Sequence, residues 1–219
     1  MDIIGPILFF LFAQFTIPAI DSNEVQLNRL ALEQMSLEKR YEEKSVNDIF
    51  KDNILLNMAY LARKVTKKEE INWEDIEKPF NYKFTLFPKQ TFAFHEDILE
   101  AYKHTVVKTT NARFNFDDGF KSDGYLTGDG VCHLASLIYW AAKNAKLTAY
   151  APTNHNFAVI PEISREYGVA IYKMPGNPSA NAMQNLYITN NKENPVIFEF
   201  DYNGAELKLS IFESVNKDL

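Results

Sequence analysis

The sequence predicts an α+β fold in which a cysteine-bearing helix packs on a small, mostly antiparallel sheet and is preceded by N-terminal helices. Apolar residues recur at helical spacing in the first third of the chain, whereas short aromatic segments follow from Phe80 onward. A strongly apolar helical face then begins at Cys132. With 219 residues, 46% of them hydrophobic, the chain is long enough to bury a substantial core.

Composition and charge exclude several classes of protein. The formal net charge of -6 argues against nucleic acid as a partner, because binding to phosphates requires a basic face. Cys132 is the only cysteine, which rules out an intramolecular disulfide and a metal site built from several thiolates. We therefore expect neither a metal ion nor a bound cofactor.

An uncharged apolar segment, Ile3–Ile20, lies near the N-terminus. Its length is the lower limit for a helix that crosses about 30 Å of hydrocarbon, so we expect export and retention in the cell envelope by a membrane anchor. No Lys or Arg precedes the segment and the cleavage signal near Ala19 is weak, so signal cleavage stays open. A buried helix of a soluble domain is the alternative interpretation.

The following segments are rich in charge. Asp21–Lys44 combines a capping-box pattern with apolar residues at helical spacing, which predicts a solvated helix or stalk. Val46–Val65 has a wider apolar stripe and predicts the first helix that packs on a core, whereas Thr66–Lys78 is interpreted as a solvated connection. The predicted divisions are 1–20 for the anchor, 21–78 for the helical stalk and linker, and 79–219 for the main domain.

The main domain mixes strands and helices. Tyr82–Phe87 and Thr91–Phe94 have the short period of strands, and Glu96–Lys108 is expected to be a helix. A loop with several glycines, Asp117–Gly130, leads into the helix that begins at Cys132.

Further strands are predicted beyond that helix. The candidates are Leu147–Ala151, Phe157–Pro161, Gly168–Tyr172 and Leu186–Thr189. Two alternating runs at the end of the chain are joined by Asn203-Gly204, a dipeptide typical of a type I′ hairpin turn.

Cys132 and His155 are the candidate catalytic pair. Cys132 lies in the first turn of its helix, where unpaired backbone N–H groups are expected to lower the thiol pKa and to bind an oxyanion. A neutral His155 imidazole can take the thiol proton and later protonate a leaving amine. Gly128 and Gly130 fit a backbone that turns tightly and lets a substrate approach the sulfur.

Neighbouring residues are assigned supporting roles. Asn154 and Asn156 flank His155 and are candidates to orient its ring or to donate to substrate. His133 points about 100° away from Cys132 on a helix, which suits packing or the oxyanion region better than the role of base. His95 and His104 lack a metal-ligand spacing and are interpreted as structural.

Less specific interpretations of these residues remain open. A free cysteine is often an inert buried residue, and a single loop histidine often bonds only to local backbone. A metal site built from Cys132, His133 and His155 is disfavoured, because adjacent ligands on one helix seldom converge. The acidic residues between Asp117 and Asp129 do not have the spacing of an EF-hand calcium loop.

The segment GDGVCHLASLIYWAAKNAKL resembles the VanW family, whose hallmark is GGVCQ followed by a helix of the type SSxLYxAAxxAGL. Further pieces resemble the family in the same order, namely PKQTFAF from Pro88, Gly124-Tyr125, Asn154-His155 and LYITNNKENPVIFEF. The resemblance covers roughly Pro88 to Phe212. The residues that match the hallmark are Gly130, Val131, Cys132, Ala135, Ser136, Leu137, Tyr139, Ala141, Ala142 and Leu147.

This resemblance implies a bacterial cell-envelope protein related to glycopeptide resistance. Some members are cysteine L,D-transpeptidases, so Cys132 would be the nucleophile, His155 the base and peptidoglycan stem peptides the partners. Gly130, His133, Asn154 and Asn156 would bind substrate or the oxyanion. His133 replaces the family's glutamine. A non-catalytic peptidoglycan-binding or resistance accessory module, and a cysteine hydrolase that uses water as acceptor, are the alternatives.

Overall fold

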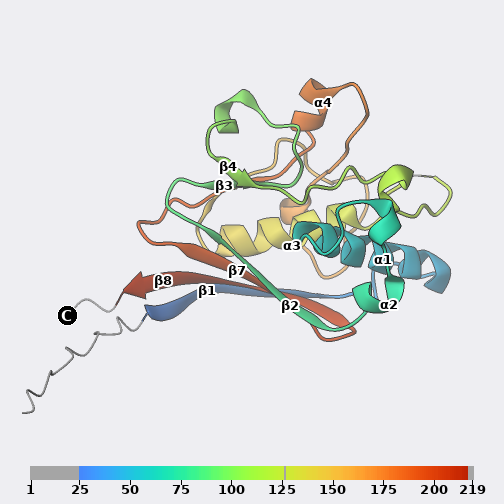
Figure 1. Cartoon of the computed structure of the whole chain (residues 1–219), viewed down its shortest axis with the longest axis horizontal. Coiled ribbons are helices and arrows are strands. Elements are labelled where there is room, and N and C mark those ends of the chain that lie inside the picture. The colour runs from blue at the N-terminus through green and yellow to red at the C-terminus, as the bar shows by residue number, and fades with distance from the viewer. Residues whose placement is uncertain (1–24, 126, 217–219) are drawn as a thin grey trace, which may run out of the picture.

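The protein forms two four-stranded sheets with a helix between them. A computed structural model describes residues 25–125 and 127–216. Figure 1 shows α3, which spans Val131–Asn144, between a sheet of long strands and a sheet of short ones. The predicted α+β class, with a cysteine-bearing helix on a mostly antiparallel sheet, is confirmed.

The larger sheet is antiparallel throughout and has the strand order β1-β8-β7-β2. Every second residue of β7 is buried, so one face of the strand packs on the core. Phe84 of β2 lies opposite Phe198 of β7, and their stacked rings have centroids 4.8 Å apart. The strands span Val25–Ser36 (β1), Phe80–Leu86 (β2), Val196–Tyr202 (β7) and Glu206–Asn216 (β8).

The hairpin predicted between the last two strands is confirmed. Tyr202 of β7 pairs with Leu207 of β8, and the Asn203 backbone N–H donates to the Glu206 carbonyl. The Asn203 side-chain oxygen accepts the N–H groups of Ala205 and Glu206 at 2.9 and 2.8 Å. Gly204 has φ +103°, a backbone conformation that favours glycine.

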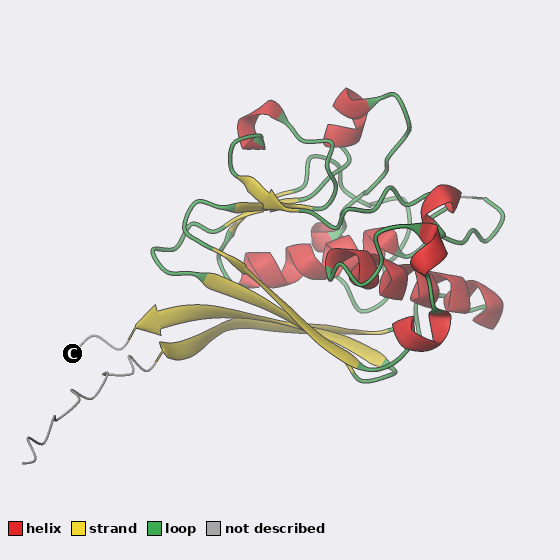
Figure 2. Cartoon of the chain, viewed as in Figure 1, coloured by secondary structure: helices red, strands yellow, loops and turns green. Residues whose placement is uncertain are grey.

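The smaller sheet has the order β4-β3-β6-β5 and consists of three-residue strands. Its β3–β4 pair is parallel, and the other pairs are antiparallel. Long irregular segments connect these strands (Figure 2). The strands span Thr91–Ala93 (β3), Val106–Lys108 (β4), Thr148–Tyr150 (β5) and Tyr187–Thr189 (β6).

Four α-helices lie in the described ranges. Helix α3 packs against strands of both sheets and against α1. The amphipathic helix predicted from Val46 to Val65 is confirmed as α1, whose C-terminal half is buried. The helices span Lys44–Leu61 (α1), Trp73–Ile76 (α2), Val131–Asn144 (α3) and Pro178–Ala182 (α4). None of the helices within residues 25–125 and 127–216 is long and apolar enough to cross a membrane.

The helix predicted for Asp21–Lys44 is wrong. Strand β1 occupies Val25–Ser36 and pairs along its length with β8. Ala31 and Met35 point to the core while Leu32 and Gln34 are exposed, a period of two that the helical interpretation missed. Residues 25–78 contribute to the same core as the rest of the molecule. The capping-box pair and the apolar segment 3–20 lie outside the described residues.

The helix predicted for Glu96–Lys108 is also wrong. This segment holds a 3-10 turn at Glu100–Tyr102 and strand β4. The Tyr102 ring stacks on Tyr187 at 4.4 Å, and the Thr91 and Thr105 hydroxyls bond at 2.9 Å, so tertiary contacts override the helical pattern. Strands are confirmed at β2, β3, β5 and β6, but the candidates at 157–161 and 168–172 form no regular strand.

Candidate active site

A glycine loop positions the start of α3. Gly128 and Gly130 have φ values of +89° and +92°, a region that disfavours residues with a Cβ atom. A Cβ atom on Gly130 would lie 2.6 Å from the Phe50 carbonyl oxygen of α1. Helix α1 therefore presses directly on the turn before Cys132, and only glycine fits there.

The Cys132 thiol is half-buried and engaged by backbone. Its Sγ lies 3.4 Å from the Ile171 nitrogen, which donates, and 3.6 Å from the Ile171 oxygen, which accepts. Burial raises the pKa of this thiol to about 11; the Asp129 carboxylate adds to the rise, while the N–H groups of Ile171 and Cys132 oppose it. The lowered pKa expected from the helix N-terminus is therefore wrong, and the resting sulfur is a thiol.

Ser136 fixes the extended segment that faces the cysteine. Its hydroxyl donates to the Cys132 carbonyl at 2.7 Å and accepts the Val169 N–H at 2.9 Å. This places the backbone of Val169 and Ile171 alongside the first turn of α3. The segment predicted as a strand at 168–172 thus serves as one wall of the site instead of a sheet strand.

His155 is buried, and its Nδ1 atom has no hydrogen-bond partner among the described residues. Its backbone N–H donates to the Gly168 carbonyl at 3.2 Å, and its ring lies against Phe157 with centroids 4.0 Å apart. A Cβ atom on Gly168 would come within 2.7 Å of the His155 carbonyl oxygen. Burial lowers the pKa of this imidazole, so it is neutral at pH 7.

His133 is a second buried imidazole in the same place. Its ring lies 5.0 Å from Phe50 and 6.4 Å from His155, perpendicular to the latter. Its Nδ1 atom also lacks a partner among the described residues. Burial lowers the pKa of His133 to about 3, and the charge of Arg40 adds to this effect. Two neutral imidazoles with a free nitrogen therefore lie close together, although buried polar atoms normally have partners.

These residues line one cavity of about 200 Å³, which we call the thiol cavity. It brings together Cys132, His155, His133 and Gly130, as the sequence predicted. It does not include Asn154 or Asn156, which are both exposed; the Asn154 amide donates to the Arg165 carbonyl at 3.2 Å. The remaining lining residues are Arg40, Tyr41, Phe50, Thr127, Gly128, Asp129, Phe157, Ala158, Val159, Ile171 and Tyr172.

The sequence did not predict that Arg40 and Phe50 line the thiol cavity. Arg40 is fully buried; its Nε donates to the Ser36 carbonyl at 2.6 Å, and its Nη atoms donate to the Pro161 carbonyl and to Glu162. Nothing in the charged stretch around Arg40 distinguishes it from its solvated neighbours. Phe50 is part of the apolar stripe of α1, but its contact with the glycine loop depends on tertiary packing.

Two polar clusters outside the thiol cavity form hydrogen bonds within the fold. The Asp118 carboxylate accepts from the backbone and guanidinium of Arg113, and His95 is buried and bonded to Gln184 and Asn185. Within residues 25–125 and 127–216, no group of three or more His, Cys, Asp or Glu side chains is arranged to hold a metal ion.

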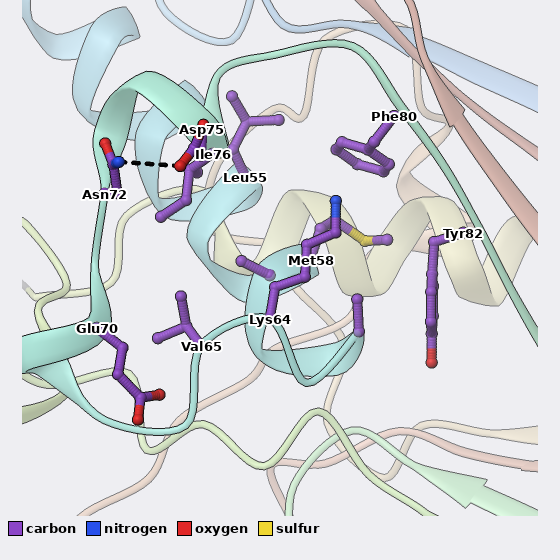
Figure 3. A pocket seen from close by; sticks show the side chains of 12 residues that line it. Leu55, Met58, Lys64, Val65, Glu70, Asn72, Asp75, Ile76, Phe80 and Tyr82 are labelled. Atoms are coloured by element: carbon purple, nitrogen blue, oxygen red, sulfur yellow. Dashed lines mark hydrogen bonds between the residues drawn. The ribbon is translucent and has the colours of Figure 1, made fainter.

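A separate cavity of about 250 Å³ lies between α1, α2 and β2. Figure 3 shows its apolar side chains, such as Met58 and Phe80, with Lys64 beside them and an Asn72–Asp75 hydrogen bond on one side. No cysteine, serine or histidine lines it. Of the two cavities, the thiol cavity is therefore the one that contains a thiol and imidazoles.

Comparison with known proteins matches the chain to a protein family. A family model described as VanW like protein matches residues 82–212, more than half of the chain. The matched range includes Cys132, His133 and His155, whereas Arg40 and Phe50 lie before it. No curated protein and no solved structure matches the chain.

Proposed function

Because the chain belongs to the VanW-like protein family, we propose that it is a cell-envelope cysteine acyltransferase of the L,D-transpeptidase type that acts on peptidoglycan stem peptides. The observation that carries this proposal is the thiol cavity, where Cys132 shares one small space with two buried imidazoles that each have a free nitrogen. A nucleophile beside a base is the arrangement that covalent acyl transfer requires.

The first step forms a thioester. The Cys132 sulfur attacks the carbonyl carbon that precedes the terminal D-Ala of a tetrapeptide stem, and His155 accepts the thiol proton. The tetrahedral intermediate then collapses: its C–N bond breaks, and the proton passes from His155 to the leaving D-Ala amine. Because the resting thiol has a pKa of about 11, proton transfer to His155 must accompany the attack.

The second step transfers the acyl group. An acceptor amine attacks the thioester carbonyl, an amide bond forms, the C–S bond breaks, and the proton of the amine returns to the sulfur through His155. When water takes the place of the amine, the same intermediate gives a carboxylic acid, and the protein is a hydrolase. The lining of the thiol cavity is mostly apolar and aromatic, which limits access of water and favours transfer.

The two imidazoles have different positions. The His155 loop packs on the Ile171 segment that contacts the sulfur, through the bond from the His155 N–H to Gly168. His133 follows Cys132 in α3 and faces Phe50. We assign proton transfer to His155, and to His133 a hydrogen bond from its neutral ring to the substrate or the oxyanion.

A non-catalytic peptidoglycan-binding or resistance accessory module is the second candidate. The sulfur of Cys132 both donates to and accepts from the backbone of Ile171, as a structural cysteine does. Its raised pKa also slows attack by a thiolate. In that case the thiol cavity would hold a stem peptide without cleaving it.

The test is the intact mass of the full chain after incubation with a tetrapeptide muropeptide. We expect an adduct of the donor minus D-Ala in the wild type, none in Cys132→Ala, and acylation slowed at least about 100-fold in His155→Gln. His104→Gln is the matched control, because His104 is exposed and lies outside the thiol cavity. Absence of adduct and of released D-Ala, with equal muropeptide affinity in wild type and Cys132→Ala, would support the binding module instead.

A further inference from the structure

The loop that carries His155 forms one wall of the thiol cavity. This His155 loop, residues 155–162, has no regular secondary structure. Its residues that line the cavity are Phe157, Ala158 and Val159. Residues 156–159 form no backbone–backbone hydrogen bond within the described part of the chain. The position of the His155 ring relative to Cys132 therefore depends on how the two ends of the loop are held.

One end of the loop is held by a backbone bond and the other end by Arg40. At the first end, the His155 N–H donates to the Gly168 carbonyl at 3.2 Å. At the far end, the Arg40 guanidinium donates to the Pro161 carbonyl at 3.2 Å and to the Glu162 carboxylate. This guanidinium is fully buried, so water does not compete for its hydrogen bonds.

Apolar contacts alone do not fix the far end. Ile160 and Ile163 are buried there, but the attraction between apolar surfaces has no preferred direction. Glu162 has φ +67°, a left-handed backbone conformation that costs free energy for a residue with a Cβ atom. Its carboxylate accepts from Arg40 and from the Ser36 N–H, the latter at 2.9 Å, so two donors hold the residue in that conformation.

Arg40 is itself fixed on the N-terminal side of the molecule. Its Nε donates to the Ser36 carbonyl at 2.6 Å, and its backbone N–H donates to the side-chain oxygen of Asn47 at 2.6 Å. Asn47 is buried in the first turn of α1. A buried guanidinium needs a counter-charge, and Glu162 is its only ion-pair partner among the described residues. The pair therefore joins the connection between β1 and α1 to the His155 loop.

We propose that Arg40 is a positioning residue for the proposed reaction. Through Glu162 it holds the His155 loop over Cys132, and so sets the distance between the base and the sulfur. This inference rests on the proposed acyltransferase function, since the distance matters for proton transfer from the thiol. Arg40 lies before residues 82–212, which match the family model, whereas Glu162 and His155 lie within them. The part of the chain that precedes the matched range thus completes the site.

Release of the loop is expected to change two rates in opposite directions. Acylation becomes slower, because the base no longer stays within reach of the thiol proton. Alkylation by iodoacetamide, which needs access to the sulfur but no bound substrate, becomes faster, because the loop that walls the cavity moves away. A pair that contributed only stability would leave both rates of the folded protein unchanged.

The test compares substitutions of two glutamates in the full chain. Glu162→Ala removes the partner of Arg40. Glu166→Ala is the matched control, because Glu166 is exposed and its one side-chain hydrogen bond among the described residues is with Ser164. In Glu162→Ala we expect acylation by the tetrapeptide muropeptide to slow about tenfold or more, at unchanged muropeptide affinity. We expect alkylation of Cys132 to accelerate about threefold or more. Glu166→Ala should match the wild type in both rates.

A milder variant keeps the test decisive if Glu162→Ala does not fold. Glu162→Gln retains an oxygen that can accept from Arg40 and Ser36, but it loses the charge. Both changes in rate should appear in this variant to a smaller extent, about two- to threefold. Near-UV circular dichroism establishes whether each variant is folded.

Failure of this inference differs from failure of the acyltransferase. If the acyl-enzyme forms but folded Glu162→Ala and Glu162→Gln keep the two rates of the control, the pair is only structural and the positioning role is refuted. A parallel fall in both rates also refutes it, because a released loop must expose the sulfur. If the wild type forms no acyl-enzyme, the acyltransferase proposal fails, and the positioning role of Arg40 fails with it.

Discussion

The two sheets of this molecule differ in how they are held together. The β1-β8-β7-β2 sheet has strands of 7 to 12 residues, which are joined by continuous backbone ladders and stacked aromatic rings. The β4-β3-β6-β5 sheet has strands of three residues, and the chain around it is largely irregular. The glycine loop and the His155 loop both belong to this irregular side.

Buried side chains replace backbone pairing on the irregular side. The Asn185 amide donates to the carbonyl groups of His95 and Asp97, and the Asn190 amide donates to those of Leu86 and Asn194. Beside Cys132, the Ser136 hydroxyl donates to the Cys132 carbonyl and accepts the Val169 N–H. Since backbone groups in a ladder are already paired, a site that offers free N–H groups and imidazoles is more readily built from such loops. The regular sheet is held by backbone ladders, and the irregular half holds the thiol cavity.

The sharpest test of this division is a core truncation in the regular sheet. Phe198→Ala removes a fully buried ring that stacks on Phe84, and we expect a loss of about 3–5 kcal/mol in the free energy of unfolding. Urea unfolding measures this loss. Val107→Ala, on an exposed position of β4, should change stability by less than about 0.5 kcal/mol.

The same variant tests the independence of the site. Below the onset of unfolding, folded Phe198→Ala should react with iodoacetamide at Cys132 at the wild-type rate, because the ring lies in the sheet and does not line the thiol cavity. A large change in that rate would show that the two halves are coupled.

The second prediction concerns acid stability on the irregular side. His133 has a pKa of about 3 in the folded protein against an ordinary value of 6.5, so the unfolded chain binds its proton first. The contribution of the neutral His133 ring to the free energy of unfolding is fully present above about pH 6.5 and is lost as the pH falls toward 3. Between pH 7 and pH 4 this loss is about 3 kcal/mol.

His133→Gln should remove that pH-dependent loss. The difference in unfolding free energy between wild type and His133→Gln is therefore expected to shift by about 3 kcal/mol in favour of the variant from pH 7 to pH 4. Parallel pH profiles for the two proteins would show that the ring is not buried in its neutral form. His104→Gln serves as the control, because His104 is exposed.

The sequence predicted the elements with a strong local pattern. Helix α3, helix α1 and the Asn203-Gly204 hairpin follow from apolar period and turn chemistry, and Cys132 and His155 were placed together on chemical grounds. Strand β1 was missed because its alternation of buried and exposed residues overlaps apolar positions at helical spacing, and because its pairing partner, β8, lies about 180 residues away in the sequence.

The raised pKa of Cys132 was missed for a related reason. A helix N-terminus is visible in sequence, but the Ile171 segment that covers the sulfur is brought there by tertiary folding. The same holds for Arg40, whose burial depends on Glu162 and Pro161 far along the chain. The sequence therefore predicted that Cys132 and His155 lie close together, whereas it did not predict the residues that surround them.

A third prediction examines the contact between α1 and the glycine loop. Gly130 and Gly176 both have positive φ, but a Cβ atom meets the Phe50 backbone at Gly130 and nothing within 4 Å at Gly176. We expect Gly130→Ala to lower the free energy of unfolding by about 1–3 kcal/mol and Gly176→Ala by about 1 kcal/mol or less. Thermal and urea unfolding measure both.

Gly130→Ala should also alter the site, since relief of the clash moves the first turn of α3. A changed alkylation rate at Cys132 is expected in Gly130→Ala alone. Equal stability losses in the two variants would mean that backbone conformation, and not the approach of Phe50, explains the need for glycine.

The smallest effect is expected at the tip of the regular sheet. The Asn203 side chain accepts two backbone N–H groups in the turn between β7 and β8, so Asn203→Ala should lower stability by about 1 kcal/mol. Asn203→Asp retains the acceptor oxygens and should recover most of that loss. Neither variant should change acylation or alkylation of Cys132, because the turn lies outside the thiol cavity. A changed reaction rate at Cys132 in either variant would contradict this expectation. It would mean that a small change at the β7–β8 turn alters the position of α3 through its packing on β1 and β8.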